Sequence, residues 1–141
     1  MSDAEDTPTP DPGLPDDDRE SAYGLFQRGL ALQRSRHHAQ AAIVLERAAV
    51  AAPGKGSILE ALGRAYFISR QRERALETFE RLLEVDPSSA YGHYALGETL
   101  RKLDRLDEAR THLRLAAALD PGSSLYRGAL RRATPPEDRE A

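Results

Sequence analysis

The chain contains four histidines, the residue type best suited to bind a metal or to transfer protons near neutral pH. His37 and His38 are adjacent, whereas His93 and His112 stand apart. No two histidines are four residues apart, and no carboxylate completes a zinc-binding pattern such as HExxH. The spacing therefore indicates turn and helix histidines, and we expect no bound metal and no cofactor.

Other residue types that carry catalysis give no stronger signal. The chain has no cysteine, which excludes a thiol nucleophile, a thiolate zinc site and a disulfide. Asp104, Asp107 and Glu108 form an acidic cluster, but such residues favour the start of a helix, where negative charge meets the helix dipole. Residues 53–56 lack the first glycine and the Lys-Ser/Thr pair of a phosphate-binding loop. Because no nucleophile or acid–base pair stands out, the sequence predicts a protein that is not an enzyme.

The strongest signal is a period of 34 residues, which runs through three copies at residues 22–55, 56–89 and 90–123. Such a period indicates one supersecondary unit stacked three times, because a single unit cannot bury its apolar face alone. Five positions keep their residue character at this spacing: Gly29, Gly63 and Gly97; Ala41, Ala75 and Ala109; Leu45, Phe79 and Leu113; Ala48, Leu82 and Ala116; Pro53, Pro87 and Pro121.

Each copy is expected to be two α-helices joined by a short turn. In the second copy, apolar residues recur with helical period over residues 56–68 and again over about 73–85, with Val85 facing inward. Pro87 ends the pair, since proline lacks an amide hydrogen and clashes with the preceding turn. Ser88 or Ser89 can then cap the next helix.

The repeated small residues predict that the two helices of a pair cross closely. A side chain larger than glycine or alanine would push the helices apart, and the bulky residue of the third column would fill the space beside the crossing. After the third copy, residues 124–133 are expected to form a capping helix. Leu125, Ala129 and Leu130 would lie on the stack, with Arg127, Arg131 and Arg132 pointing outward.

This pattern resembles the tetratricopeptide repeat family. The resemblance covers 102 of the 141 residues and implies an all-α solenoid of three helix pairs in a right-handed superhelix, with the C-terminal capping helix. Arg28 and His93 are the main departures, because the family has leucine and a large apolar residue there. The residues that carry the resemblance in the second copy are Leu59, Leu62, Gly63, Tyr66, Ala75, Phe79, Leu82 and Pro87.

The resemblance also implies where a partner binds, because the first helix of each pair lines a concave groove in this family. Aromatic residues in such a groove can be contact residues for a partner. They can equally pack between neighbouring helices, and both interpretations stay open. The groove positions correspond here to Tyr23, Phe26, Leu30, Gln33, Arg34, Ser57, Glu60, Arg64, Phe67, Ile68, Tyr91, Tyr94, Glu98, Arg101 and Lys102.

The basic groove residues favour carboxylates, which arginine can meet with two hydrogen bonds. One subgroup of the family clamps a terminal carboxylate with lysine, asparagine and arginine, but this chain has Phe26 and Leu30 at two of those positions. The expected partner is therefore another protein or peptide that offers apolar anchors and some acidic residues.

Charge is unevenly distributed along the chain. Residues 1–20 hold eight acids and one base, whereas residues 21–133 hold 12 acids and 18 bases. The proline-rich acidic segment 1–20 and residues 134–141 are expected to be disordered tails around a repeat domain at 21–133. The acidic segment can fold over the basic groove and compete with a partner, or simply be solvated.

The sequence predicts a protein–protein interaction module: an adaptor, a co-chaperone or a regulatory subunit. No apolar run suits a membrane span and the first residues do not resemble a signal peptide, which favours the cytoplasm. Arginine greatly outnumbers lysine, as is typical of a GC-rich bacterial genome. Two alternatives stay open: a nucleic-acid-binding regulator, because the repeat region is basic, and a self-associating structural scaffold.

Overall fold

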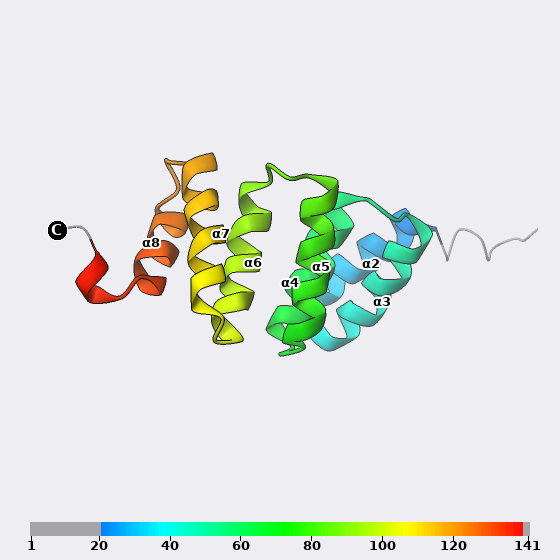
Figure 1. Ribbon diagram of the computed structural model, residues 1–141. Helices are drawn as coiled ribbons and strands as arrows, with labels where there is room; N and C mark the ends of the chain where they lie inside the picture. Colours follow the sequence, from blue (N-terminus) through cyan, green and yellow to red (C-terminus); the bar gives the residue numbers. More distant parts are fainter. Residues whose placement is uncertain (1–20, 140–141) are drawn as a thin grey trace, which may run out of the picture.

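The computed structural model describes residues 21–139, so the predicted acidic tail at 1–20 lies outside the described residues. The described part is an all-α array with no strand (Figure 1). None of its helices is long and apolar enough to cross a membrane. The elements are α2 (Ala22–Arg34), α3 (His38–Ala51), α4 (Gly56–Ile68), α5 (Arg72–Val85), α6 (Ala90–Lys102), α7 (Leu106–Leu119), α8 (Ser124–Ala133) and the short 3-10 helix η1 (Pro136–Asp138).

The helices pack in chain order as three pairs, α2–α3, α4–α5 and α6–α7, and α8 packs on the last pair. This confirms the predicted fold of three helix pairs and a final helix. The helices predicted over residues 56–68 and 124–133 have the bounds of α4 and α8, and α5 begins one residue earlier than expected.

Serine side chains cap the N-terminus of three of the four helices α2, α4, α6 and α8. Ser21, Ser89 and Ser123 each accept a hydrogen bond from the backbone N–H three residues later, at 3.0, 2.9 and 3.1 Å. These serines are 34 residues apart or a multiple of it, and Lys55 occupies the remaining position without a side-chain cap. Ser89, and not Ser88, is thus the cap of α6.

The turn inside each pair uses a left-handed residue that is not glycine. Arg36, Arg70 and Asp104 have φ of +66°, +69° and +64° and are spaced by the repeat period. The next residue closes the turn; in the second pair the Gln71 N–H donates to the Tyr66 carbonyl at 2.8 Å. This bond satisfies a carbonyl at the helix end, which offsets a backbone cost of about 1–2 kcal/mol for a residue with a Cβ.

The repeated glycines allow the close crossing that the sequence predicts. A Cβ on Gly63 would lie 2.4 Å from the Phe79 ring, and one on Gly97 would lie 2.7 Å from Leu113 Cγ. Both distances are far below a normal contact. The side chains that occupy the missing volume, Phe79 and Leu113, are themselves buried.

Three expectations about the edges of the array are wrong. Val85 is 46% exposed because it is the last residue of α5, a position that is also exposed at Leu119 in the next copy. Leu125 is 52% exposed; α8 instead contacts α6 one residue later, through Tyr126 against Tyr94. Residues 136–138, expected within a tail without regular structure, form η1.

Replacing Gly63 with alanine is expected to lower the free energy of unfolding by about 2 kcal/mol, because the new methyl group overpacks a buried ring. Gly56→Ala is the matched control on the same helix, since its Cβ would make an ordinary contact of 3.7 Å with Leu82. Urea unfolding followed by circular dichroism measures both variants. Equal stabilities for the two variants would contradict the assigned role of the glycine column.

Candidate functional site

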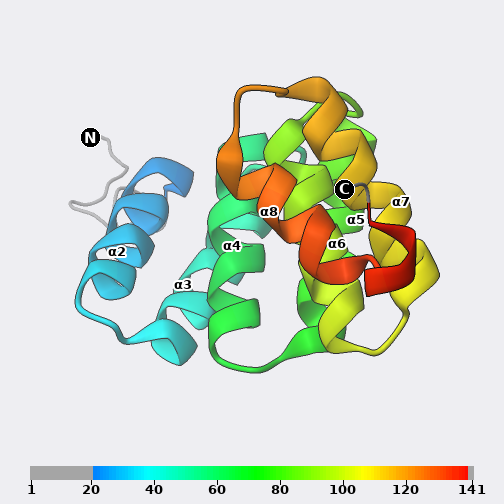
Figure 2. The ribbon, with the colours of Figure 1, turned by 90° about the vertical axis from the view of Figure 1, so that its left-hand side faces the viewer.

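The array curves toward the side formed by the first helix of each pair and by α8. α2 contacts α4, α4 contacts α6 and α6 contacts α8, whereas α3, α5 and α7 do not approach one another within residues 21–139. Helices that lie closer together are on the inside of a curve. The concave side is therefore formed by α2, α4, α6 and α8, and Figure 2 views it from the α8 end.

A hollow of about 400 Å³ opens on this side between α4 and α6, which we call the concave hollow. Aromatic and basic side chains dominate its lining. Eight of the fifteen groove residues predicted from the sequence meet here. The lining residues are Arg64, Phe67, Ile68, Phe79, Tyr91, Tyr94, Ala95, Glu98, Arg101 and Lys102.

A row of aromatic rings runs along the hollow. Tyr91 meets Phe79 edge-on with ring centroids 6.4 Å apart, and lies 6.1 Å from Tyr94. Tyr94 in turn lies 5.1 Å from Tyr126 on α8. Tyr91 and Tyr94 are half-buried, so each ring packs on its neighbours while part of it lines the hollow. Packing between helices and lining of the hollow thus coexist at these two positions.

Arg64 is held against Tyr91. Its Nη1 donates to the Tyr91 hydroxyl at 3.2 Å, and its guanidinium carbon lies 5.6 Å from the ring centroid. Burial raises the pKa of Tyr91, although Arg64 opposes the shift, and burial together with Glu98 raises the pKa of Tyr94. Both phenols therefore stay protonated at neutral pH and can donate hydrogen bonds to a carbonyl or carboxylate in the hollow.

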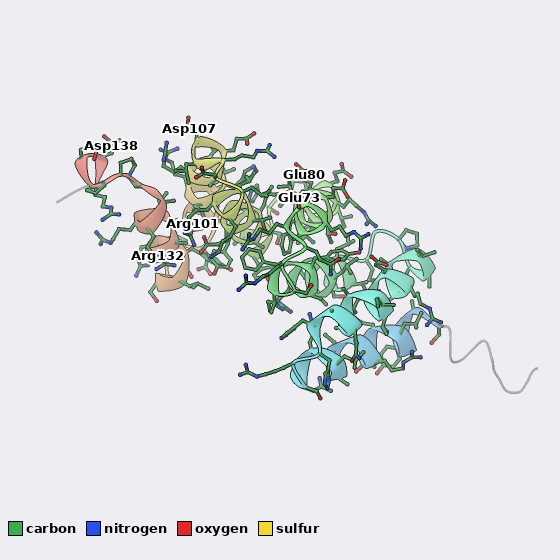
Figure 3. All side chains as sticks on the ribbon, turned by 90° about the horizontal axis from the view of Figure 1, so that it is seen from below. Glu73, Glu80, Arg101, Asp107, Arg132 and Asp138 are labelled. Atoms are coloured by element: carbon green, nitrogen blue, oxygen red, sulfur yellow. The ribbon has the colours of Figure 1, made fainter. Side chains whose placement is uncertain are left out.

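One carboxylate neutralises part of the positive charge. Glu98 has a side chain only 12% exposed; it accepts a hydrogen bond from Arg101 Nε at 2.7 Å and lies 3.9 Å from Arg132 Nη2. Arg101 and Arg132 lie near one another toward the α8 end (Figure 3). Lys102 is exposed and has no ion pair among the described residues. Lys102 and Arg64 therefore supply the charge that Glu98 does not neutralise.

The predicted groove residues of the first copy do not line this hollow. Phe26 and Leu30 pack against the core, and Gln33 Nε2 donates to the Ala61 carbonyl at 2.9 Å, which joins α2 to α4. Tyr23 is 74% exposed and Arg34 is exposed.

On α4, Ser57 and Glu60 also lie outside the lining. Sequence reasoning missed Phe79 as a lining residue, although its place in the bulky column beside the glycine was the available signal.

The structure brings together two histidines that the sequence left apart. The rings of His93 and His112 stack with centroids 5.3 Å apart, and their Nδ1 atoms are 3.0 Å apart. His93 Nε2 lies 2.8 Å from the Pro87 carbonyl, which can only accept, so this nitrogen carries the proton. In the neutral pair, His93 Nδ1 then accepts from His112 Nδ1–H. Within the described range no group of three or more potential ligands could hold a metal ion.

Residues 60–124 match the family model of the tetratricopeptide repeat. The fold of the described residues agrees with solved tetratricopeptide repeat domains, and residues 60–124 carry the repeat of that family. Comparison with curated protein sequences gives no significant match.

Several solved structures are similar at low sequence identity. The first repeat domain of Spaghetti (RPAP3), bound to an HSP90 peptide, has a TM-score of 0.77 and 18% identity over 80% of this chain and 90% of its own. The OM64 domain of Arabidopsis has a TM-score of 0.77 and 17% identity over 81% and 94%. The Yersinia enterocolitica secretion chaperone SycD, in complex with a YopD peptide, has a TM-score of 0.69 and 18% identity over 79% and 85%.

The histidine pair predicts a loss of stability in acid. Burial, and then the neighbouring His93, lower the pKa of His112 in the folded protein. His112 is therefore protonated at a higher pH in the unfolded chain than in the folded protein. The folded protein keeps its full stability above the unfolded pKa of about 6.5 and loses part of it as the pH falls below that value. Urea unfolding between pH 7.5 and pH 5 is expected to show a smaller pH slope for His112→Gln than for the native chain. His37→Gln, in an exposed turn, should keep the native slope; identical slopes for all three proteins would contradict this origin.

Proposed function

We propose that this chain is a protein–protein interaction module, an adaptor, co-chaperone or regulatory subunit of the cytoplasm, that binds a segment of another protein in its concave groove. The observation that carries this proposal is the concave hollow, where aromatic surface and unneutralised positive charge meet on the inner side of the array. RPAP3 and SycD, which share the fold, were each solved with a peptide. Their complexes support a peptide ligand for this fold.

The side chains of the hollow indicate the chemistry of the segment. Phe67, Tyr91 and Tyr94 offer apolar area at a low cost in side-chain entropy, which suits an apolar anchor. Lys102 and Arg64 are placed to meet a carboxylate beside that anchor. The volume admits a few side chains, so the proposed ligand is an extended or helical segment with an apolar residue next to acidic ones.

The remaining groove residues of the first copy form the outer part of the proposed site. Tyr23 and Arg34 are exposed on α2. They are available to a longer segment, whereas Phe26 and Leu30 contribute mainly to the core. We therefore place the main contribution to affinity in α4 and α6.

Two substitutions in the hollow test the proposal with controls of the same chemistry. Tyr94→Ala and Lys102→Glu are each expected to weaken the captured partner's binding about tenfold, as for contact residues near an interface centre. Ile43→Ala removes exposed apolar surface on α3 and Lys55→Glu reverses an exposed charge before α4, both outside the groove, and each is expected to have less than a threefold effect. Partners are captured from the source cell with the native chain, and their affinity for each variant is then measured by titration.

The outcome that would contradict the proposal is equal binding by all four variants, once circular dichroism shows each to be folded.

The salt dependence of binding distinguishes nucleic acid as the alternative ligand, because binding to phosphates falls steeply as salt rises from 50 to 200 mM. Capture dominated by nucleic acid with that steep salt dependence would replace the proposed function by the regulator alternative.

A further inference from the structure

A second hollow, of about 580 Å³, lies at the α8 end of the array between α7, α8 and η1. We call it the arginine hollow, because five arginines line it beside a single carboxylate, Asp138. The arginines are Arg110, Arg114, Arg127, Arg131 and Arg139. The sequence pattern did not predict this site, because it forms only where two pairs of arginines from different helices meet: Arg110 and Arg114 of α7, and Arg127 and Arg131 of α8.

The structure fixes these guanidinium groups without neutralising most of them. Arg110 Nη1 donates to the Ala133 carbonyl at 3.1 Å, and Arg139 Nε donates to the Thr134 carbonyl at 2.8 Å. Arg127 likewise donates to the Pro121 carbonyl. A carbonyl satisfies an N–H group but carries no net charge, so the positive charge remains.

Only one of the five has an ion pair in the described part of the chain. Arg110 pairs with Asp107, whose side chain is 94% exposed. Arg114 and Arg131 are exposed, and their side chains have no ion-pair or hydrogen-bond partner within residues 21–139. An anion entering the hollow would therefore meet several guanidinium groups with free N–H donors, which suit carboxylates.

The repeat period shows that no further helix of this array belongs in the hollow. α8 occupies the place of a first helix in a fourth unit, and Arg131 lies 34 residues after Gly97. At Gly97 even a Cβ would lie 2.7 Å from the side chain of the partner helix. An arginine at that position excludes the close crossing of a second helix. The arginine hollow is therefore open to a ligand of opposite charge.

The chain itself carries a segment of the opposite charge. Residues 1–20 hold eight carboxylates against one arginine, and three of them are consecutive at residues 16–18. This segment joins the array at Ser21, directly before α2, whereas α7 and α8, which line the arginine hollow, are at the opposite end of the array (Figure 1). Within one molecule it would have to cross the whole array, whereas copies arranged end to end bring one segment to the next copy's hollow.

We infer that the arginine hollow binds the acidic segment, residues 1–20, of a second copy of this chain. The contact is heterologous, because it joins the N-terminal end of one copy to the α8 end of the next, and it therefore extends into short chains of copies. It does not depend on the partner proposed for the concave hollow. The concave hollow is the less favourable site for the segment, because Glu98 already pairs with two of its neighbouring arginines.

The absence of cysteine allows a direct test on the full chain. Ser2→Cys carries a spin label, and this protein is mixed with an equal amount of isotope-labelled native chain that has no spin label. Amide signals of residues 110–114 and 127–131 are expected to broaden at low salt and to recover at 0.5 M salt. Sedimentation of the native chain is expected to show mass that rises with concentration at low salt.

The double variant Arg114→Glu with Arg131→Glu is expected to abolish the broadening and to weaken self-association about tenfold. Arg28→Glu with Arg81→Glu makes the same charge change at exposed positions outside the hollow and is expected to keep both. No broadening in the mixture, broadening centred on α4 and α6, or equal loss in both double variants would each overturn the inference. Broadening found only when both labels are on one molecule would overturn the second copy as the occupant.

Discussion

The contact of a glycine with a bulky side chain inside each helix pair is the constraint on which the rest of the structure depends. With only a hydrogen at Gly63, Phe79 fills the space between α4 and α5, and no larger residue fits at that point. The same ring then meets Tyr91 of the next pair edge-on. One side chain therefore sets the spacing within a pair, joins that pair to its neighbour and forms part of the lining of the concave hollow.

The fold could be predicted from the sequence because each repeated position has a steric reason that acts locally. Glycine permits the crossing, proline ends the pair, and α4 and α8 have the predicted bounds. The turns could not be predicted in the same way, since Arg36, Arg70 and Asp104 adopt a conformation that glycine usually marks. There the hydrogen bond that closes the turn onto the end of the preceding helix selects the backbone conformation, and the residue type carries little information.

The candidate site could be predicted only as far as the register of the first helices. Tyr23 and Tyr91 share a register position, yet Tyr23 is 74% exposed while Tyr91 contacts Phe79 and Arg64 of the preceding pair. Whether an aromatic residue lines a hollow thus depends on its contacts with the preceding helix pair. The spacing of residues within one helix does not encode those contacts. His93 and His112 show the same limit, because their contact is between two helices and has no sequence spacing.

The two hollows differ in how the structure satisfies their arginines, and this difference determines what each can recognise. In the concave hollow, Arg101 is paired with the carboxylate of Glu98 and Arg64 stacks on a tyrosine ring, so aromatic surface surrounds the positive charge that remains. In the arginine hollow, backbone carbonyls hold Arg127 and Arg139 and leave their charge in place. Charge in an exposed site is screened by salt, whereas apolar contact is not. The binding proposed at the concave hollow should therefore persist at salt concentrations that weaken the contact proposed at the α8 end, so ionic strength can separate the two.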